Sequence, residues 1–379
     1  MHAKRLNALT SLRFFAASMI VLLHMNGTFW PAIGMQGFTT GVSFFFVLSG
    51  FILCLVYGEL RSVAEIRRFY SARIARIWPM HLLSIALLLI VTDAALPSWK
   101  IAAANIFLLQ SWVPHPDWYF SLNGVAWSIS TEFAFYALYP LLMWRLRWNW
   151  PVKLACAAFG IVACSLIYPI IRPANSDEAM LVLAGLLYIS PVARVLEFLV
   201  GMLTATLYSR VAYHIKGATS IWTLAEIAVC ALVASGVQYA WPTYQNLSPQ
   251  HPQLAEWILQ SGQFWALSAL VFTFAVGRGA LSRLLSSRPF VFLGEISFAI
   301  YMIHQVIIRA MEQHMHRLIS EHPIYSAALF MTITVSGAAV LHIFFEKPLR
   351  NLLMRALRKL ADHHDVGSPS RKVSGRDAR

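Results

Sequence analysis

Two side chains of unlike chemistry, Arg13 and His24, stand eleven residues apart in an apolar segment near the N-terminus. At about 100° per residue, eleven helical steps end roughly 20° past three full turns, so both side chains would share one helix face. The helical rise separates them by about 16 Å along the axis. This spacing suits a thin anionic ligand whose charged end binds Arg13 and whose reactive end reaches His24. The alternative is an arginine that snorkels to the membrane surface and a histidine that bonds to a neighbouring helix.

A second basic feature opens another apolar segment, where Arg73 and Arg76 are spaced i and i+3. On a helix this spacing puts both guanidinium groups on one face. Two guanidinium groups side by side can hold phosphate through paired hydrogen bonds. The other explanation is topological, because a loop on the cytoplasmic side of a membrane is basic in any case.

Ser128, Glu132 and Tyr136 follow one another at intervals of four residues in a further apolar segment. Helical periodicity aligns them as one polar stripe. A carboxylate in such a place must be paired or protonated, so Glu132 is a candidate for proton transfer or for binding a substrate hydroxyl. A structural ion pair with Arg194 is the alternative, although Glu197 lies at i+3 from Arg194 and is the more natural partner of that arginine.

The remaining histidines carry weaker signals. His81 and His342 are interpreted as packing residues, whereas His304 is left open as a residue that could support the site. His314 and His316 form an H-x-H pair, but no cysteine or carboxylate cluster at ligand spacing accompanies them, so no metal site is predicted. The chain also lacks the sequence motifs of P-loop nucleotide hydrolysis, serine hydrolases and zinc proteases.

The segments that must position these residues have the composition of a membrane protein. Hydrophobic residues make up 58% of the 379 residues and charged residues 12%, whereas a soluble domain carries about 25% charged residues. That charge is too little to cover a water-facing surface. The same composition excludes a disordered chain, and four cysteines without a C-x-x-C pair exclude a disulfide scaffold.

Ten segments have about the 20 mostly apolar residues that a membrane crossing requires. They are residues 9–29, 41–58, 77–96, 127–144, 154–171, 192–209, 221–240, 260–277, 290–309 and 324–345. Each must be a helix, because no backbone group can stay unpaired in lipid. The predicted fold class is therefore an all-α integral membrane protein with about ten transmembrane helices. The first segment is expected to be retained rather than cleaved as a signal peptide.

Basic residues gather in alternate loops of this ten-segment arrangement. The side that includes both termini holds 25 of the 30 Lys and Arg residues, and the positive-inside rule then puts the N- and C-termini in the cytoplasm. Membrane orientation thereby explains the net charge of +13, and no nucleic-acid partner is predicted. The expected location is the plasma membrane, the inner membrane of a bacterium, with lipid around the helices.

The chain divides into a multi-span membrane domain over residues 1–350 and a basic cytoplasmic tail over residues 351–379, expected to be disordered from Asp362 onward. The longest external loop, residues 93–127, contains an apolar stretch from Ile101 to Trp112. This stretch is too short to span and is expected to lie in the interface or to re-enter the membrane.

Six motifs follow one another along the chain. They are Leu9-Thr-Ser-Leu-Arg-Phe-Phe-Ala-Ala with His24, Gly41-Val-Ser-Phe-Phe-Phe-Val-Leu-Ser-Gly-Phe, Phe69-Tyr-Ser-Ala-Arg-Ile-Ala-Arg-Ile-Trp-Pro, Trp127-Ser-Ile-Ser-Thr-Glu-Phe, Phe292-Leu-Gly-Glu-Ile-Ser-Phe-Ala-Ile-Tyr-Met-Ile-His and Phe345-Glu-Lys-Pro. In this order they closely resemble the membrane acyltransferase-3 family of bacterial O-acyltransferases. The resemblance covers about residues 5–350.

The resemblance implies transfer of an acyl group, usually acetyl, from cytoplasmic acyl-CoA to a hydroxyl of an extracytoplasmic glycan. Arg13 and His24 match the family's motif of an arginine and a histidine separated by ten residues, and Arg73 and Arg76 match its arginines at the inner mouth of the third span. Acyl-CoA, expected to be acetyl-CoA, would be a donor substrate, and no bound cofactor is expected. In one departure, many members have two acidic residues in the Trp-Ser-x-Ser motif, whereas Glu132 is the only one here.

The resulting hypothesis places the CoA phosphates on Arg13, Arg73 and Arg76 and the thioester near His24. His24 would act as general base or carry a transient acyl group, assisted by Glu132. Three further residues are candidate supporting residues: Ser128, Tyr136 and His304. Some relatives carry a fused extracytoplasmic domain that completes transfer; none is expected here, so the protein would act alone or pass the acyl group to a separate extracytoplasmic partner protein.

Two other function classes also fit charged residues inside a membrane. One is a transporter or flippase of a lipid-linked glycan, although the chain shows no paired half-repeats with broken helices. The other is a membrane glycosyltransferase, which we would expect to carry acidic residues in its first external loop; residues 30–40 contain none. Acyl transfer is the favoured hypothesis.

Overall fold

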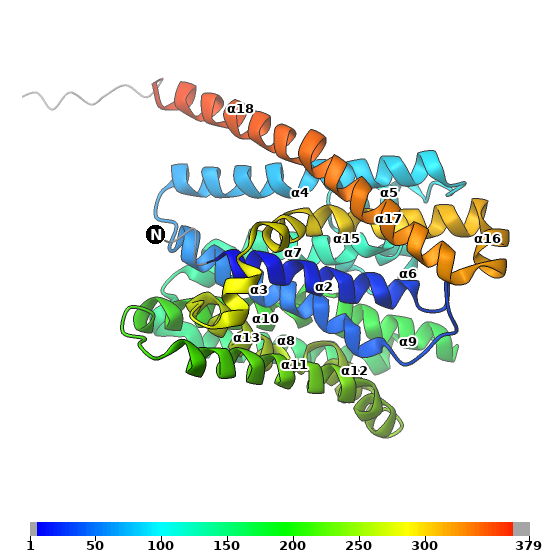
Figure 1. Ribbon diagram of the computed structural model, residues 1–379, viewed down its shortest axis with the longest axis horizontal. Coiled ribbons are helices and arrows are strands. Elements are labelled where there is room, and N and C mark those ends of the chain that lie inside the picture. The colour runs from blue at the N-terminus through cyan, green and yellow to red at the C-terminus, as the bar shows by residue number, and fades with distance from the viewer. Residues whose placement is uncertain (1–5, 367–379) are drawn as a thin grey trace, which may run out of the picture.

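A computed structural model describes residues 6–366, with the surroundings of side chains described as far as residue 357. Long helices run approximately along one axis of the molecule (Figure 1). Between residues 6 and 366 the β pairing is limited to one isolated bridge, between Asn26 and Trp30. The prediction of an all-α protein is therefore confirmed.

Eleven long helices build the bundle in the described part of the chain. They are α2 (Asn7–Met25), α3 (Thr40–Tyr57), α4 (Val63–Val91), α7 (Trp127–Met143), α8 (Leu146–Ile171), α10 (Pro191–Val211), α11 (Thr219–Leu247), α13 (Phe264–Val276), α15 (Arg288–His314), α17 (Pro323–Leu341) and α18 (Lys347–Val366). Shorter helices connect them: α5 (Trp99–Ile106), α6 (Pro116–Tyr119), α9 (Ser176–Ala184), α12 (Pro252–Ser261), α14 (Ala280–Leu285) and α16 (His316–Glu321). Single turns of other helix types are η1 (Gln36–Thr39), η2 (Gln110–Trp112), η3 (Gly124–Ala126), η4 (Gly185–Ile189) and η5 (His342–Glu346).

All ten predicted transmembrane segments are helical. Nine runs of helix in the described residues are long and apolar enough to cross a membrane. The tenth segment is α7, whose 17 residues make about 26 Å of helix, slightly less than the roughly 30 Å of a bilayer core. Over half of α7 is buried among other helices, so this helix is surrounded mainly by protein rather than by lipid.

The start of α2 and the end of α18 lie at the same end of the bundle, at the left of the view in Figure 1. The side of the membrane on which each terminus lies stays a prediction from the distribution of Lys and Arg.

Helix α4 begins fourteen residues before its predicted transmembrane segment. Ser62 caps it: the Ser62 Oγ accepts a hydrogen bond from the Glu65 backbone N–H (3.2 Å), and Glu65 Oε2 accepts one from the Ser62 N–H (3.1 Å). This reciprocal cap satisfies backbone donors that the first helical turn leaves unpaired. As a result, Arg73 and Arg76 lie on a continuous helix that leads into the membrane.

The loop over residues 93–127 folds against the bundle. The apolar stretch from Ile101 to Trp112 forms the end of α5 and the turn η2. Ser111 is buried there, and its Oγ lies 2.7 Å from the Oγ of Ser130 in α7. At the other end of the chain α18 continues to Val366, so the part of the predicted disordered tail up to that residue is helical, and residues 367–379 lie outside the described residues.

At two crossings between central helices, a glycine allows the backbones to come into close contact. A Cβ atom at Gly50 of α3 would overlap the Phe198 carbonyl of α10, and one at Gly294 of α15 would overlap the Thr10 carbonyl of α2. Small residues let membrane helices approach closely and gain packing contacts. The close approach of α15 to α2 matters most here, because both helices carry candidate site residues.

Candidate functional site

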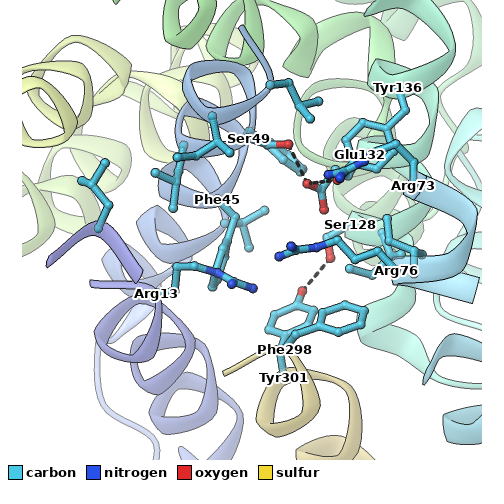
Figure 2. Close-up of a pocket in the computed structure, with 18 of the residues that line it drawn as sticks. Arg13, Phe45, Ser49, Arg73, Arg76, Ser128, Glu132, Tyr136, Phe298 and Tyr301 are labelled. Carbon is cyan, nitrogen blue, oxygen red and sulfur yellow. Dashed lines mark hydrogen bonds between the residues drawn. The ribbon is translucent and has the colours of Figure 1, made fainter. Parts of the chain in front are cut away.

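A cavity of about 290 Å³ opens among α2, α3, α4, α7 and α15. It lies toward the end of the bundle where α2 begins, since Leu6, Leu9 and Arg13 all line it. Its other polar lining residues include most of those predicted from sequence: Arg73, Arg76, Ser128, Glu132 and Tyr136. Three of these helices, α2, α4 and α7, thus bring the predicted donor-binding residues and the polar stripe to one place (Figure 2).

Arg13 and Arg76 point toward each other from opposite walls of this cavity (Figure 2). Within residues 6–357 neither guanidinium has a carboxylate within ion-pair distance or a hydrogen-bonding partner in the protein. Arg73, by contrast, has partners in the protein. Its Nη2 donates a hydrogen bond to the Tyr57 hydroxyl (3.1 Å), and its guanidinium lies near the rings of Tyr57 and Tyr136. The cavity therefore holds two cationic groups that the protein itself does not neutralise by direct contact.

Glu132 is the one carboxylate that lines the cavity. Its Oε1 accepts hydrogen bonds from the Ser49 hydroxyl of α3 (2.7 Å) and the Tyr136 hydroxyl of α7 (2.6 Å). The alternative ion pair with Arg194 does not form, since Arg194 Nε lies 3.1 Å from Glu197 Oε2 instead. Three guanidinium groups and one carboxylate leave the cavity with a formal excess of two positive charges.

His24 lies in the last turn of α2 and is paired with His304 of α15. The His24 Nδ1 and His304 Nε2 atoms are 2.8 Å apart, and the ring centroids are 5.1 Å apart. His304 is fully buried, and its Nδ1 lies 2.7 Å from the Tyr301 carbonyl oxygen and 3.2 Å from that of Ile300. The hydrogen bond that orients His24 therefore involves His304, and none of the described hydrogen bonds joins His24 to Glu132.

The histidine pair and the arginine cavity are separate in this structure. His24 and His304 do not line the cavity, whereas Tyr301, one turn before His304, does. The Tyr301 hydroxyl lies 2.8 Å from the Ser128 Oγ, and its ring centroid is 5.7 Å from that of His304. Tyr301 thus belongs to the wall of the arginine cavity and also lies beside the ring of His304.

Ser49, Tyr301 and Phe45 are site residues that sequence reasoning missed. Each belongs to a motif that was recognised: Ser49 and Phe45 to the segment from Gly41, and Tyr301 to the segment that ends at His304. Membership in these motifs could have identified the three residues as candidates. Their partners, however, come from other helices, and no local spacing identifies such a partner.

The other intramembrane histidines make contacts that suit a packing role. His81 is fully buried, and its Nε2 lies 2.8 Å from the Asn105 carbonyl oxygen. His342 begins the turn η5, and its Nδ1 lies 2.8 Å from Glu346 Oε2. Over the residues whose side chains are described, no three His, Cys, Asp or Glu residues are grouped as a metal ion would need.

Comparison with known proteins assigns the chain to a family. The model of the acyltransferase-3 family, described as an acyltransferase domain, matches residues 6–341. The acyltransferase MdmB of Streptomyces mycarofaciens is 29% identical, over 93% of this chain and 93% of MdmB. The O-acetyltransferase OatA of Staphylococcus aureus strain NCTC 8325 / PS 47 is 24% identical, over 91% of this chain. The chain spans only 57% of the length of OatA.

No solved structure matches the chain. The family match nevertheless covers nearly all of the residues that build the helical bundle and the cavity. It agrees with the resemblance seen in the six sequence motifs. This protein belongs to the acyltransferase-3 family of membrane acyltransferases.

Proposed function

We propose that this acyltransferase takes its acyl group from acyl-CoA on the cytoplasmic side and transfers it to a hydroxyl of an extracytoplasmic glycan. The observation that carries the proposal is the cavity in which Arg13 and Arg76 have no partner from the protein. An unpaired charge inside a membrane protein costs several kcal/mol unless an ion or water compensates it. A ligand with phosphate groups is the natural complement, because guanidinium groups bind phosphate in a fork geometry.

Acyl-CoA has the required shape as well as the required charge. Its phosphates would bind Arg13, Arg73 and Arg76, and its pantetheine arm would point along α2 toward His24. The distance of about 16 Å along the α2 axis between Arg13 and His24 is one that a thin extended arm can cover. Tyr301 and Ser128, which line the cavity and are hydrogen-bonded to each other, would have to move apart if the thioester passes between them.

The chemistry is acyl transfer with His24 as general base. The acceptor hydroxyl gives its proton to His24 while its oxygen forms a bond to the thioester carbon. The carbon–sulfur bond then breaks, and the CoA thiolate takes the proton from His24. A transient acyl group on His24 would divide the same transfer into two steps. Glu132, which accepts two hydroxyl hydrogen bonds, would assist by binding a substrate hydroxyl or by proton transfer.

The relatives support an oxygen acceptor. OatA is named an O-acetyltransferase, which favours an acetyl group and an ester product in this protein too. A glycan acceptor is a further part of the proposal, and the protein would either complete the transfer alone or pass the acyl group to a separate extracytoplasmic partner protein.

The test is transfer of label from radioactive acetyl-CoA in membrane vesicles that contain the protein. Inverted vesicles, which expose the cytoplasmic face, should produce alkali-labile labelled ester, and right-side-out vesicles should not. His24→Ala should abolish the label at normal protein yield, because it removes the base that takes the proton of the acceptor hydroxyl. Near-normal labelling by His24→Ala would disprove the role of His24. Glycan movement without consumption of acetyl-CoA would instead favour a transporter.

A further inference from the structure

The hydrogen bonds around His304 determine which of its ring nitrogens carries a proton. A carbonyl oxygen can only accept a hydrogen bond, so His304 Nδ1, 2.7 Å from the Tyr301 carbonyl oxygen, must be the donor. A neutral imidazole carries one proton. The Nε2 of a neutral His304 therefore has only a lone pair to offer.

That lone pair in turn determines the protonation of His24. Because His304 Nε2 can only accept, the proton in the 2.8 Å contact belongs to His24 Nδ1. The second nitrogen of a neutral His24, Nε2, is then unprotonated and has no protein partner among the described hydrogen bonds. A general base needs a free lone pair, and Nε2 is the atom of His24 that has one.

We infer that His304 is a positioning residue that holds His24 in the tautomer in which Nε2 is the base. The inference rests on the proposed function, because it assumes that His24 is the base of acyl transfer. When His24 Nε2 takes the proton of the acceptor hydroxyl, His24 becomes an imidazolium that still donates from Nδ1 to His304. No other reactant is needed, since the proton later leaves with the CoA thiol.

This role is that of the buried aspartate in a serine-protease triad, which orients a histidine and stabilises its imidazolium. A neutral histidine suits the middle of a membrane better, because an ionised carboxylate there must itself be compensated. The backbone of α15 provides the rigid support, since the carbonyls of Tyr301 and Ile300 both face His304 Nδ1. Helix α15 also packs directly on α2, where the crossing at Gly294 leaves no room for a side chain.

Two substitutions separate positioning from packing. In His304→Gln the amide oxygen can replace Nε2 as the acceptor for His24, whereas His304→Leu fills similar space and accepts nothing. We expect His304→Leu to lower kcat by about 100-fold or more, within the range of general base catalysis. The KM for acetyl-CoA should stay within about twofold, since His304 does not line the arginine cavity, and His304→Gln should recover kcat to within about tenfold of wild type.

His81→Leu is the matched control. Like His304, His81 is 0% exposed and bonds to a backbone carbonyl, so any loss due to removing a buried histidine should appear there too. Its kcat per folded molecule should stay near the wild-type value.

Two results would overturn the inference: a normal kcat in folded His304→Leu, or a kcat in folded His304→Gln as low as that of His24→Ala. If His304→Leu does not fold, the His304→Gln variant decides alone. An active His24→Ala variant would instead overturn the proposed function, so the two failures are distinguishable.

Discussion

Two groups of arginines in the membrane-spanning part of the chain differ in what surrounds them: Arg194 is fully buried among protein partners, whereas Arg13 and Arg76 are half-buried beside a cavity. Arg194 is fully buried between α3, α10 and α12. Its Nη1 donates to the Gln260 carbonyl (2.7 Å) and Ser261 Oγ (2.6 Å), its Nη2 donates to Ser43 Oγ (3.0 Å), and its Nε faces Glu197. Arg13 and Arg76 face a cavity and have no such set of partners.

The difference between Arg194 and the pair of Arg13 and Arg76 is that the protein itself satisfies only the first guanidinium. Burying a guanidinium is tolerable when a carboxylate and well-placed oxygens satisfy it. The Arg194 cluster meets that condition without help from outside. The arginine cavity, with one carboxylate for three guanidinium groups, meets it only when an anion or water enters. The comparison therefore favours a stabilising role for the Arg194 cluster and supports the proposal that the arginine cavity binds the donor.

The largest expected effect is on stability, from Arg194→Ala. The substitution leaves the fully buried Glu197 without its cationic partner, which typically costs about 3 to 5 kcal/mol of unfolding free energy. Thermal or denaturant unfolding of the protein in detergent measures this loss. Arg172→Ala is the control, because Arg172 is exposed and should change the unfolding free energy by less than about 0.5 kcal/mol. Unchanged stability in Arg194→Ala would contradict the structural role.

The next effect is on donor binding, from Arg76→Ala. Loss of a guanidinium–phosphate contact should cost on the order of 1.5 to 3 kcal/mol, which raises the acyl-CoA concentration needed by roughly 10- to 100-fold. Arg76→Lys should restore binding only in part, because an ammonium lacks the planar fork. Initial rates at a series of acetyl-CoA concentrations measure the effect. If Arg76 only sets topology, lysine should rescue fully and the acetyl-CoA dependence of Arg76→Ala should not change.

The smallest effect concerns the charge of the cavity, from Glu132→Gln. Glutamine keeps an oxygen that can accept from Ser49 and Tyr136 but removes the one carboxylate that lines the cavity. The donor phosphates should then bind more tightly, by about 1 kcal/mol, because the cavity loses a negative charge whose repulsion of the phosphates is partly screened by water and salt. A roughly fivefold lower KM for acetyl-CoA would indicate this gain, and kcat should fall if Glu132 assists the transfer as proposed. A higher KM would mean that Glu132 contributes to donor binding in some other way.

Sequence alone predicted the helical segments and the residues that local spacing connects. The ten apolar segments are helices because lipid offers no hydrogen bonds to the backbone. The pair of Arg194 and Glu197 forms because i and i+3 positions adjoin on a helix. The stripe of Ser128, Glu132 and Tyr136 lines one cavity for the same reason.

Contacts between helices could not be predicted in this way. The sequence does not decide the role of His304. In the structure its ring lies against that of His24, which is 280 positions earlier in the chain. Local spacing gives no indication that Ser49 donates a hydrogen bond to Glu132. It gives none that Tyr301 bonds to Ser128 at the cavity wall. The motifs located these residues but did not identify their partners.

The physical reason is the difference in range between the two kinds of information. Helical periodicity and hydropathy are local, so residue spacing alone predicts that Arg13 and His24 share a face of one membrane helix, about 16 Å apart. Which face meets which neighbour depends on close packing, such as the contact of Gly294 with the backbone at Thr10. The packing of the helices therefore establishes that His24 pairs with His304, that Arg13 faces Arg76, and that Tyr301 lies beside His304 at the cavity wall.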